Sequence, residues 1–425
     1  MTTKETRRKF LKKCVFTACS GFLLSRGYHV AEASEIGQTW SGWREGEMEI
    51  HSIYTGCGES IFHILPDGTT MLIDAGEWRA NEDIKVDILP NETRHPGEWI
   101  ARYIQRVNPR GVNVDYMMLS HFHEDHSGGC EYSAGRTQGR GDDYCISGLS
   151  EVGEYLHFDK AFDRGYPDYS FHAPGCEATE SNFCKFVRWT MKEKGLKMEK
   201  FETGKCDQIK LCRTGTDEYD FHIRNLCANG VVWTGKDMET RNLFEGWSGN
   251  INENALSIGI LFCYGPFRYF SAGDIDQSCF DANMRALPVE AIVGQATGPV
   301  DVCKANHHGC NNAMPPEFVQ AVRPRVYTVN VYDQTHTGED TLRTMMSEEL
   351  YSGPRLVCPT IFPSSRKAAC ETMPFFNSIA TEGGHVVIKV YDQGRKYKVY
   401  YLTADDESMK IKAVYGPFEA SNKDA

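Results

Sequence analysis

At 425 residues, the chain can hold one large domain or two of ordinary size. Its 41% hydrophobic and 24% charged residues are ordinary for a soluble globular protein. The formal net charge of −12 becomes −17 without residues 1–33, which carry seven basic and two acidic side chains, a net +5. A surface this acidic argues against a long nucleic-acid track, because phosphate neutralisation needs Lys and Arg, but it permits a small or locally bound phosphodiester.

The first 33 residues have the pattern of an export signal. A twin-arginine-like motif, Thr6-Arg7-Arg8-Lys9-Phe10-Leu11-Lys12, precedes a modest apolar run over 14–24 and an A-x-A cleavage site at 31–33. That run is too short for an ordinary membrane span, so we expect no stable membrane anchor. We therefore predict a twin-arginine signal peptide over 1–33, the twin-arginine export machinery as a partner, and a periplasmic or extracellular protein. A basic cytoplasmic tail is the alternative.

The 16 cysteines are irregularly spaced and contain no CxxC pair. This pattern matches neither a zinc ribbon nor a compact disulfide scaffold. Folding in a reducing compartment before export favours many free, buried thiols, and spacing alone assigns no disulfide. Cys57, Cys130 and Cys310 lie nearest to the candidate site segments described below.

After the signal, the chain begins with short strands. Apolar runs separated by turn residues predict strands, and an apolar repeat at helical spacing predicts an amphipathic helix. The expected strands are 48–55, 60–65 and 70–73, and the expected helix is 96–107. The third strand ends in Asp74-Ala75-Gly76. Asp74 is either a turn former or a carboxylate that orients a metal-bound histidine from behind, and the histidines downstream favour the second role.

The stretch 119–129, Leu-Ser-His-Phe-His-Glu-Asp-His-Ser-Gly-Gly, is the strongest chemical signal in the chain. It follows an apolar, β-rich run, so we predict a strand that ends in a ligand-bearing loop. His121 and His123 are two residues apart and share a face of extended backbone. Asp125 and His126 follow the turn, so their side chains can face a different position from those of His121 and His123. Two pairs aimed at neighbouring points suit a two-metal site, and a polar surface loop is the alternative.

Residues 131–250 are harder to assign, and we expect an insertion or an elaborated loop region over the site. A helix is predicted at 180–194, and strands are predicted at 219–223 and 230–234. The aromatic residues within 158–171 fit ordinary core packing better than they fit a substrate pocket.

Two further strand ends supply candidate ligands. A hairpin over 256–263 and 268–271 runs into Gly273-Asp274, where an aspartate can reach two metals as a bridging ligand. A short strand over 300–304 leads to His307-His308-Gly309. Adjacent histidines cannot easily bind one metal, so we expect one to coordinate and the other to face the substrate.

The remaining sequence completes the predicted fold. Helices are expected at 315–322 and 341–350, a strand at 325–331, and tail strands at 385–391, 396–402 and 409–414. His336 lies between the strand at 325–331 and the next helix, and it is either a site residue or a surface histidine. Because the chain shows no internal repeat and no low-complexity linker, we predict one domain over 34–425, with an insertion at 131–250 and a C-terminal β extension at 384–415.

Taken in chain order, the motifs resemble those of the metallo-β-lactamase superfamily. They are Asp74, His121-x-His123-x-Asp125-His126, Gly273-Asp274 and His307-His308-Gly309. Residues 254–323 are most similar to the metallo-hydrolase domain of the competence protein ComEC and its soluble relatives. The resemblance implies an α/β (α+β) fold, a four-layer αββα sandwich with the site at one edge of the two sheets.

The resemblance also implies two divalent metal ions, most simply zinc, with manganese or iron as alternatives. It assigns His121 and His123 to one ion and Asp125 and His126 to the other. By the same resemblance, Asp274 would bridge the ions, His308 would complete the second, His307 would lie near the substrate, and Asp74 would orient a ligand.

The chain departs from the family pattern at the third histidine expected for the first ion. The corresponding stretch offers Asn252 and Asn254, and His222, the only histidine between residues 173 and 306, is too far upstream. We therefore expect the first ion to be weaker, more exchangeable, or ligated by amide oxygen or water, with Asn252 and Asn254 in its surroundings.

These features predict an exported hydrolase that uses a metal-bound hydroxide on a small-molecule or phosphodiester-type substrate. Asp125 is expected to orient the nucleophile, and His307 or His336 to donate a hydrogen bond or protonate the leaving group. Hydrolysis of a lactone, thioester or β-lactam is the first alternative, since it shares the metals. A non-catalytic, secreted metal-binding module is the second.

Overall fold

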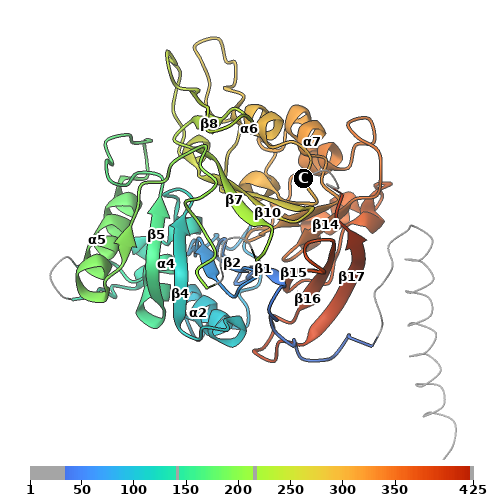
Figure 1. Cartoon of the computed structure of the whole chain (residues 1–425), viewed down its shortest axis with the longest axis horizontal. Coiled ribbons are helices and arrows are strands. Elements are labelled where there is room, and N and C mark those ends of the chain that lie inside the picture. The colour runs from blue at the N-terminus through green and yellow to red at the C-terminus, as the bar shows by residue number, and fades with distance from the viewer. Residues whose placement is uncertain (1–33, 140–142, 214–217, 422–425) are drawn as a thin grey trace, which may run out of the picture.

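The computed structural model describes residues 34–139, 143–213 and 218–421. Two β-sheets pack face to face, and helices cover the outer face of each (Figure 1). This is the four-layer αββα sandwich of the α+β class expected from the sequence, so the predicted fold class is confirmed. The signal peptide predicted at 1–33 lies outside the described residues.

Within the described residues, the first sheet has nine strands in the order β17-β16-β15-β1-β2-β3-β4-β5-β6. β3 pairs with β4 and β4 with β5 in parallel, so the three strands end at one edge of the sheet. The bounds are β1 Met48–Ser52, β2 Ile61–Ile64, β3 Thr70–Ile73, β4 Asn113–Leu119, β5 His157–Asp163, β6 Lys197–Met198, β15 His385–Tyr391, β16 Lys396–Leu402 and β17 Ile411–Glu419.

In the same part of the chain, the second sheet has eight strands in the order β14-β13-β12-β11-β10-β7-β8-β9. β11, β12, β13 and β14 pair in parallel, so their carboxyl ends also share one edge. The bounds are β7 Phe221–Ala228, β8 Val231–Trp233, β9 Thr240–Asn242, β10 Gly259–Tyr264, β11 Phe267–Ala272, β12 Val302–Lys304, β13 Val326–Val329 and β14 Leu356–Pro359.

Helices form the two outer layers (Figure 1). α2 begins with Pro96 and buries Ile100, Ile104 and Val107, a spacing that places them on one face against the first sheet. Helices of the first outer layer are α2 Pro96–Val107, α4 Gly148–Tyr155 and α5 Glu177–Lys194. Those of the second are α6 Val289–Thr297, α7 Pro316–Val322, α8 Glu339–Met345 and α9 Ser364–Cys370.

Alternation along the strands creates the central core between the sheets. In β4, Tyr116 and Met118 face the second sheet, whereas Met117 and Leu119 face the helices. The inward residues meet apolar side chains of the second sheet such as Phe262. The stacked sheets therefore hold their strand ends next to each other.

The segment 131–250, predicted as an insertion, contributes strands to both sheets. β5 and β6 extend the first sheet beyond β4, and β7, β8 and β9 extend the second beyond β10. The tail predicted as a β extension supplies β15, β16 and β17, which continue the first sheet from β1. No helix in the described ranges is both long and apolar enough to cross a membrane.

Candidate metal centre

The first sheet brings five predicted residues to the edge where the sheets meet. Asp74 follows β3, and His121 and His123 follow β4. A short helix, α3 (Glu124–Ser127), then carries Asp125 and His126. β3 and β4 are parallel neighbours, so Asp74 lies directly behind the ligand segment. Its carboxylate accepts hydrogen bonds from Ser120 N and Ser120 Oγ, each at 2.7 Å.

The second sheet supplies the opposing residues. Asp274 follows β11, and its backbone N–H donates to Ser257 Oγ at 3.0 Å. His307 and His308 lie in a turn after β12 and both adopt left-handed backbone, with φ of 46° and 52°. This conformation costs about 1–3 kcal/mol per residue, so the surrounding packing must offset it. Backbone strain of this kind is concentrated at functional sites.

Two imidazole nitrogens and two carboxylate oxygens lie close together. His126 Nε2 lies 3.1 Å from Asp274 Oδ2 and 3.3 Å from Asp125 Oδ2. His308 Nε2 lies 3.0 Å from Asp274 Oδ2 and 3.1 Å from Asp125 Oδ2. The two Nε2 atoms are 3.3 Å apart. Ligands placed about 2.0–2.1 Å from one tetrahedral ion are separated by about 3.3 Å, so the cage fits a zinc-sized ion.

The orientation of the two imidazoles points to the same conclusion. His126 Nδ1 lies 2.7 Å from Asp74 Oδ2, and His308 Nδ1 lies 2.8 Å from the carbonyl oxygen of Asn330. Both partners are acceptors, so each Nδ1 carries a proton and each Nε2 turns inward. Two Nε2–H groups or two lone pairs facing each other repel, whereas a cation between two lone pairs attracts both.

The charges around the cage shift the pKa of every member. Burial acts to lower the pKa of His308, but Asp274 and Asp125 outweigh it and raise this pKa to about 9. The same carboxylates raise the pKa of His126 against burial. Burial acts to raise the pKa of Asp274, but His126 and His308 outweigh it and hold the pKa well below its ordinary range. In the absence of an ion the rings therefore take up protons, and binding a metal releases them.

A second histidine pair lies beside this cage. His121 Nε2 is 3.0 Å from His123 Nδ1, and the rings of His121 and His126 have centroids 4.2 Å apart. Burial, reinforced by His126 and His123, lowers the pKa of His121 well below its ordinary value. The ring is therefore neutral, which is the form that binds metal. The pair stands where the first ion was predicted, and its ligand role stays a prediction.

Asn252 and Asn254 belong to a polar network around His307. Asn252 Oδ1 accepts from Asn254 N at 2.9 Å, and Asn254 Nδ2 lies 2.9 Å from Asp276 Oδ2 and 3.3 Å from His307 Nε2. His307 Nδ1 lies 3.2 Å from Asp276 Oδ2. Asp276 is fully buried, and its carboxylate lies beside the ring of His307.

His336 reaches the site. It is buried, and its ring stacks on His308 with centroids 5.1 Å apart. Burial, together with His308, lowers the pKa of His336 to about 3, so the ring is neutral. Tyr332 packs edge-on against both rings and donates its hydroxyl hydrogen to Asp125 Oδ2 at 2.7 Å.

Glu59 and Lys304 are buried site residues that sequence reasoning missed. A donor atom of Glu59 lies within 4.8 Å of those of His126, Asp274 and His308. Lys304 Nζ is 3.1 Å from Glu59 Oε2 and 3.5 Å from Asp274 Oδ1, so it balances part of the buried negative charge. The available signals were an acid in a glycine-rich turn and a lysine ending an apolar strand, and each is ordinary by itself.

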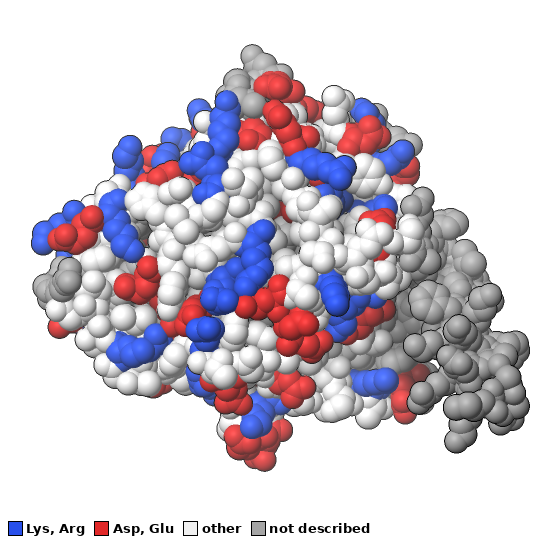
Figure 2. Space-filling model, turned by 90° about the horizontal axis from the view of Figure 1, so that it is seen from below, with Lys and Arg blue, Asp and Glu red and all other residues white. Residues whose placement is uncertain are grey.

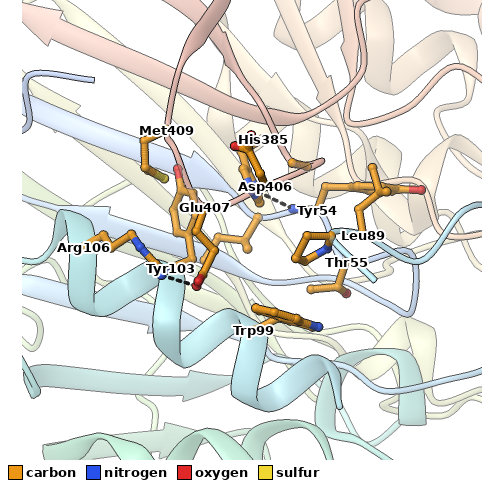
Figure 3. Close-up of a pocket in the computed structure, with 13 residues that line it drawn as sticks. Tyr54, Thr55, Leu89, Trp99, Tyr103, Arg106, His385, Asp406, Glu407 and Met409 are labelled. Carbon is orange, nitrogen blue, oxygen red and sulfur yellow. Dashed lines mark hydrogen bonds and ion pairs between the residues drawn. The ribbon is translucent and has the colours of Figure 1, made fainter. Parts of the chain in front are cut away.

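The small cavity drawn in Figure 3 is separate from this centre. Its volume of about 20 Å³ is near that of one water molecule, and it shares no lining residue with the metal centre. Tyr54 N donates to His385 Nδ1 at 3.1 Å there, and Arg106 pairs with Glu407 (Figure 3). The cavity is too small to hold a substrate.

Comparisons with known proteins give only distant structural similarity. No family model matches the chain, and no curated protein matches it. One similar crystal structure, from Parabacteroides distasonis and provisionally assigned as a metal-dependent hydrolase, has 12% identity, covers 76% of this chain and 97% of its own, and has a TM-score of 0.34. Another, a diphosphatase of the PhnP family, has 12% identity, covers 80% and 96%, and has a TM-score of 0.31. At these TM-scores, the activity has to be argued from the site's own geometry.

Proposed function

We propose that the chain is a metal-dependent hydrolase that acts on a small phosphodiester-type substrate. The observation that carries the proposal is the buried cage of His126, His308, Asp125 and Asp274, whose donor atoms are spaced for one ion. The neighbouring pair of His121 and His123 supports a second ion beside it.

The residues present fit a divalent ion by number and type of donor. His126, His308, Asp125 and Asp274 would hold one ion, and His121 and His123 would hold the other together with Asp274. Asp274 lies next to both groups, and its Oδ1 accepts no hydrogen bond from the described residues but pairs with Lys304 at 3.5 Å. Such ions supply Lewis acidity and lower the pKa of water, so that hydrolysis proceeds at neutral pH.

The protein's own groups then position the reactants. Tyr332 fixes the carboxylate of Asp125, which orients the attacking water. His307 is the more exposed of the two adjacent histidines, and Asp276 holds its ring. Burial acts to lower the pKa of His307, but Asp276 and Asp274 outweigh it and raise this pKa. In its protonated form, the ring can donate from Nε2 to a phosphoryl or leaving-group oxygen when substrate replaces the contact with Asn254.

The choice of substrate rests on the sequence resemblance and on charge. Residues 254–323 resemble the ComEC-type domain, which favours a phosphodiester over a β-lactam. On the face seen in Figure 2, Lys and Arg side chains are interspersed with Asp and Glu. Such a surface suits a small or locally held phosphodiester better than a long nucleic-acid chain.

The test is a panel of an aryl phosphodiester, a lactone and a chromogenic β-lactam. The phosphodiester should be hydrolysed, and the activity should disappear on chelation and in Asp274→Ala, then return to the chelated wild type with zinc or manganese. Asp207→Ala, at an exposed position, is the control. A fully metallated protein without turnover, or one that prefers the lactone, would contradict the proposal.

Export through the twin-arginine pathway is a further part of the proposal. The motif at 6–12 supports it, as does the Cys130–Cys145 disulfide, because disulfides persist in oxidising compartments. Replacing Arg7 and Arg8 by Lys should leave the protein in the cytoplasm, as measured by cell fractionation. Unchanged distribution would exclude this route.

A further inference from the structure

A second group of potential ligands lies apart from the metal centre. Glu77, His95 and Glu151 each offer one donor atom, and the three atoms lie within 4.8 Å of one another. Glu77 follows β3, His95 immediately precedes α2, and Glu151 lies in the first turn of α4. Both glutamates are at most 1% exposed.

Glu77 uses each oxygen differently. Oε2 accepts from Ser147 Oγ at 2.8 Å and from Gly148 N at 3.4 Å, and so satisfies the start of α4. Oε1 lies 3.1 Å from His95 Nδ1 and accepts from Arg79 at 3.1 Å. The Arg79 side chain is 36% exposed, so it can move away from this oxygen.

Glu151 is the member with an unused oxygen. Its Oε1 accepts from Arg136 at 2.6 Å, whereas its Oε2 is buried and accepts no hydrogen bond from the described residues. A Cβ added to Gly97 would lie only 2.8 Å from Oε2, so this oxygen faces the start of α2, two residues from His95. A buried carboxylate oxygen left without a donor is costly, and a cation removes that cost.

The cluster opens to solvent on the side of His95. The imidazole is 28% exposed and lines a cavity of about 350 Å³ with Arg79, Arg94, Glu131 and Tyr132. The two carboxylates lie behind it. An ion can therefore enter from the cavity and keep water molecules on that side.

We propose that Glu77, His95 and Glu151 form a second, structural site for a divalent transition ion such as zinc or manganese. Two carboxylates and one imidazole form a ligand set that suits these ions, and water from the cavity completes the coordination. The site joins three segments, the end of β3 and the starts of α2 and α4.

An ion at this position would stabilise the segment that carries Asp125 and His126. Glu77 N donates to Glu124 O at 2.9 Å, and Gly129 N donates to Glu77 O at 3.3 Å, so the backbone of Glu77 holds both ends of α3. Fixing the side chain of Glu77 therefore also fixes the base of the ligand helix. The effect is on position, since none of the three residues belongs to the catalytic cage.

The experiment measures bound metal per chain by elemental analysis, after loading the full chain with zinc or, separately, manganese and removing excess. His95→Ala and Glu151→Gln should each bind one ion fewer than the unsubstituted protein. His157→Ala is the matched control, because its exposed ring also pairs with a single carboxylate, Asp159. An equal metal content in His95→Ala and the unsubstituted protein would overturn the proposal. The three residues would then form an ion-pair network that binds no metal.

A thermal measurement separates this site from the catalytic one. In Asp274→Ala, which weakens the catalytic cage, added zinc should still raise the unfolding midpoint, and the rise should be smaller when His95→Ala is added. If Glu151→Gln does not fold, the partly exposed His95 carries the test alone. An equal rise in the single and the double variant would also overturn the proposal. Neither readout uses turnover, so a failure of the proposed hydrolase activity leaves the result interpretable.

Discussion

At the scale of single residues, the centre depends on which atom of each side chain faces the ion. Asp74 determines this for His126, because it accepts the Nδ1 hydrogen at 2.7 Å. Asp74→Asn presents an amide N–H at this position, so we expect the affinity for the caged ion to fall about 10–100-fold. Competition with a metal-binding dye measures it.

Asp67→Asn provides the comparison for Asp74. Asp67 is also a buried aspartate next to a strand, and it accepts from Thr69 N in the turn before β3. Its substitution should lower stability and leave the metal affinity unchanged. Equal affinities in Asp74→Asn and the unsubstituted protein would contradict the assigned role of Asp74.

The position of the Asp125 carboxylate depends on the hydroxyl group of Tyr332. Tyr332→Phe keeps the ring against His308 and His336 and removes the hydrogen bond to Asp125. Because hydrogen bonds to charged groups contribute about 1.5–3 kcal/mol, we expect kcat for an aryl phosphodiester to fall about 10-fold or more at unchanged metal content.

Tyr397→Phe is the matched control for the hydroxyl. Tyr397 is fully buried, and its hydroxyl has no hydrogen-bond partner among the described residues. Its removal should leave kcat unchanged. If Tyr332→Phe behaved the same way, Asp125 would not need the hydroxyl for its position.

At the scale of elements, a buried ion pair holds the loop that carries His121 and His123. Arg164, after β5, pairs with Glu253 at 2.6 Å, and Glu253 Oε1 accepts from Phe122 N at 2.9 Å. Removing one partner leaves an uncompensated buried charge, so Arg164→Met should lower the free energy of unfolding by about 3–5 kcal/mol. Denaturant unfolding measures it.

Two comparisons make the Arg164 prediction specific. The exposed pair of Arg343 and Glu339 should contribute less than about 1 kcal/mol when broken by Arg343→Met. Adding Glu253→Gln to Arg164→Met should restore part of the lost stability, because it removes the unpaired charge. A double variant less stable than Arg164→Met would contradict this account.

The sequence predicted those elements whose signal is local. Strand ends carrying His121, Asp274 or His308 are visible because a short apolar run and its ligands are adjacent in the chain. Helix α6 was not predicted, since its buried residues lie on more than one face and even Glu290 is buried, so no amphipathic repeat appears. Strand β14 was not predicted either, because it is only four residues long and ends in Pro359.

The site residues that were not predicted lack such a local signal. Glu59 and Lys304 are 245 positions apart in the sequence and meet only through the fold. Asp276 resembles any turn aspartate until Asn254, Ser278 and Asn312 are seen to donate to it. Ligands have spacing patterns, whereas the groups that balance and orient them have none.

At the scale of the whole molecule, a buried histidine makes stability depend on pH. His63 of β2 lies between the sheets, stacked on Phe262 with centroids 4.7 Å apart, and burial lowers its pKa to about 3. In the unfolded chain its pKa is about 6.5. Between these values the unfolded state binds more protons, so stability falls as the pH falls, by about 1.4 kcal/mol per pH unit.

His63→Phe should reduce the slope of the unfolding free energy against pH by the contribution of about one proton, because phenylalanine does not titrate. Urea unfolding between pH 6 and 4 measures the slope for both proteins. Other groups also titrate there, including the metal centre, but they are common to both and cancel in the comparison. His157→Gln, at an exposed position on β5, should leave the slope unchanged. Equal slopes for His63→Phe and the parent would exclude His63 as a contributor.

The division of ligands between the two sheets has a consequence for hydrogen–deuterium exchange. Asp125 and His126 come from one sheet, and Asp274 and His308 come from the other, with more than a hundred residues of chain between them. A bound ion therefore links the two sheets at this edge. Without the ion, the strand ends of each sheet can unfold locally and independently of the other sheet. Amides at the ends of β4 and β12 should then exchange independently in the metal-free protein and together in the loaded one.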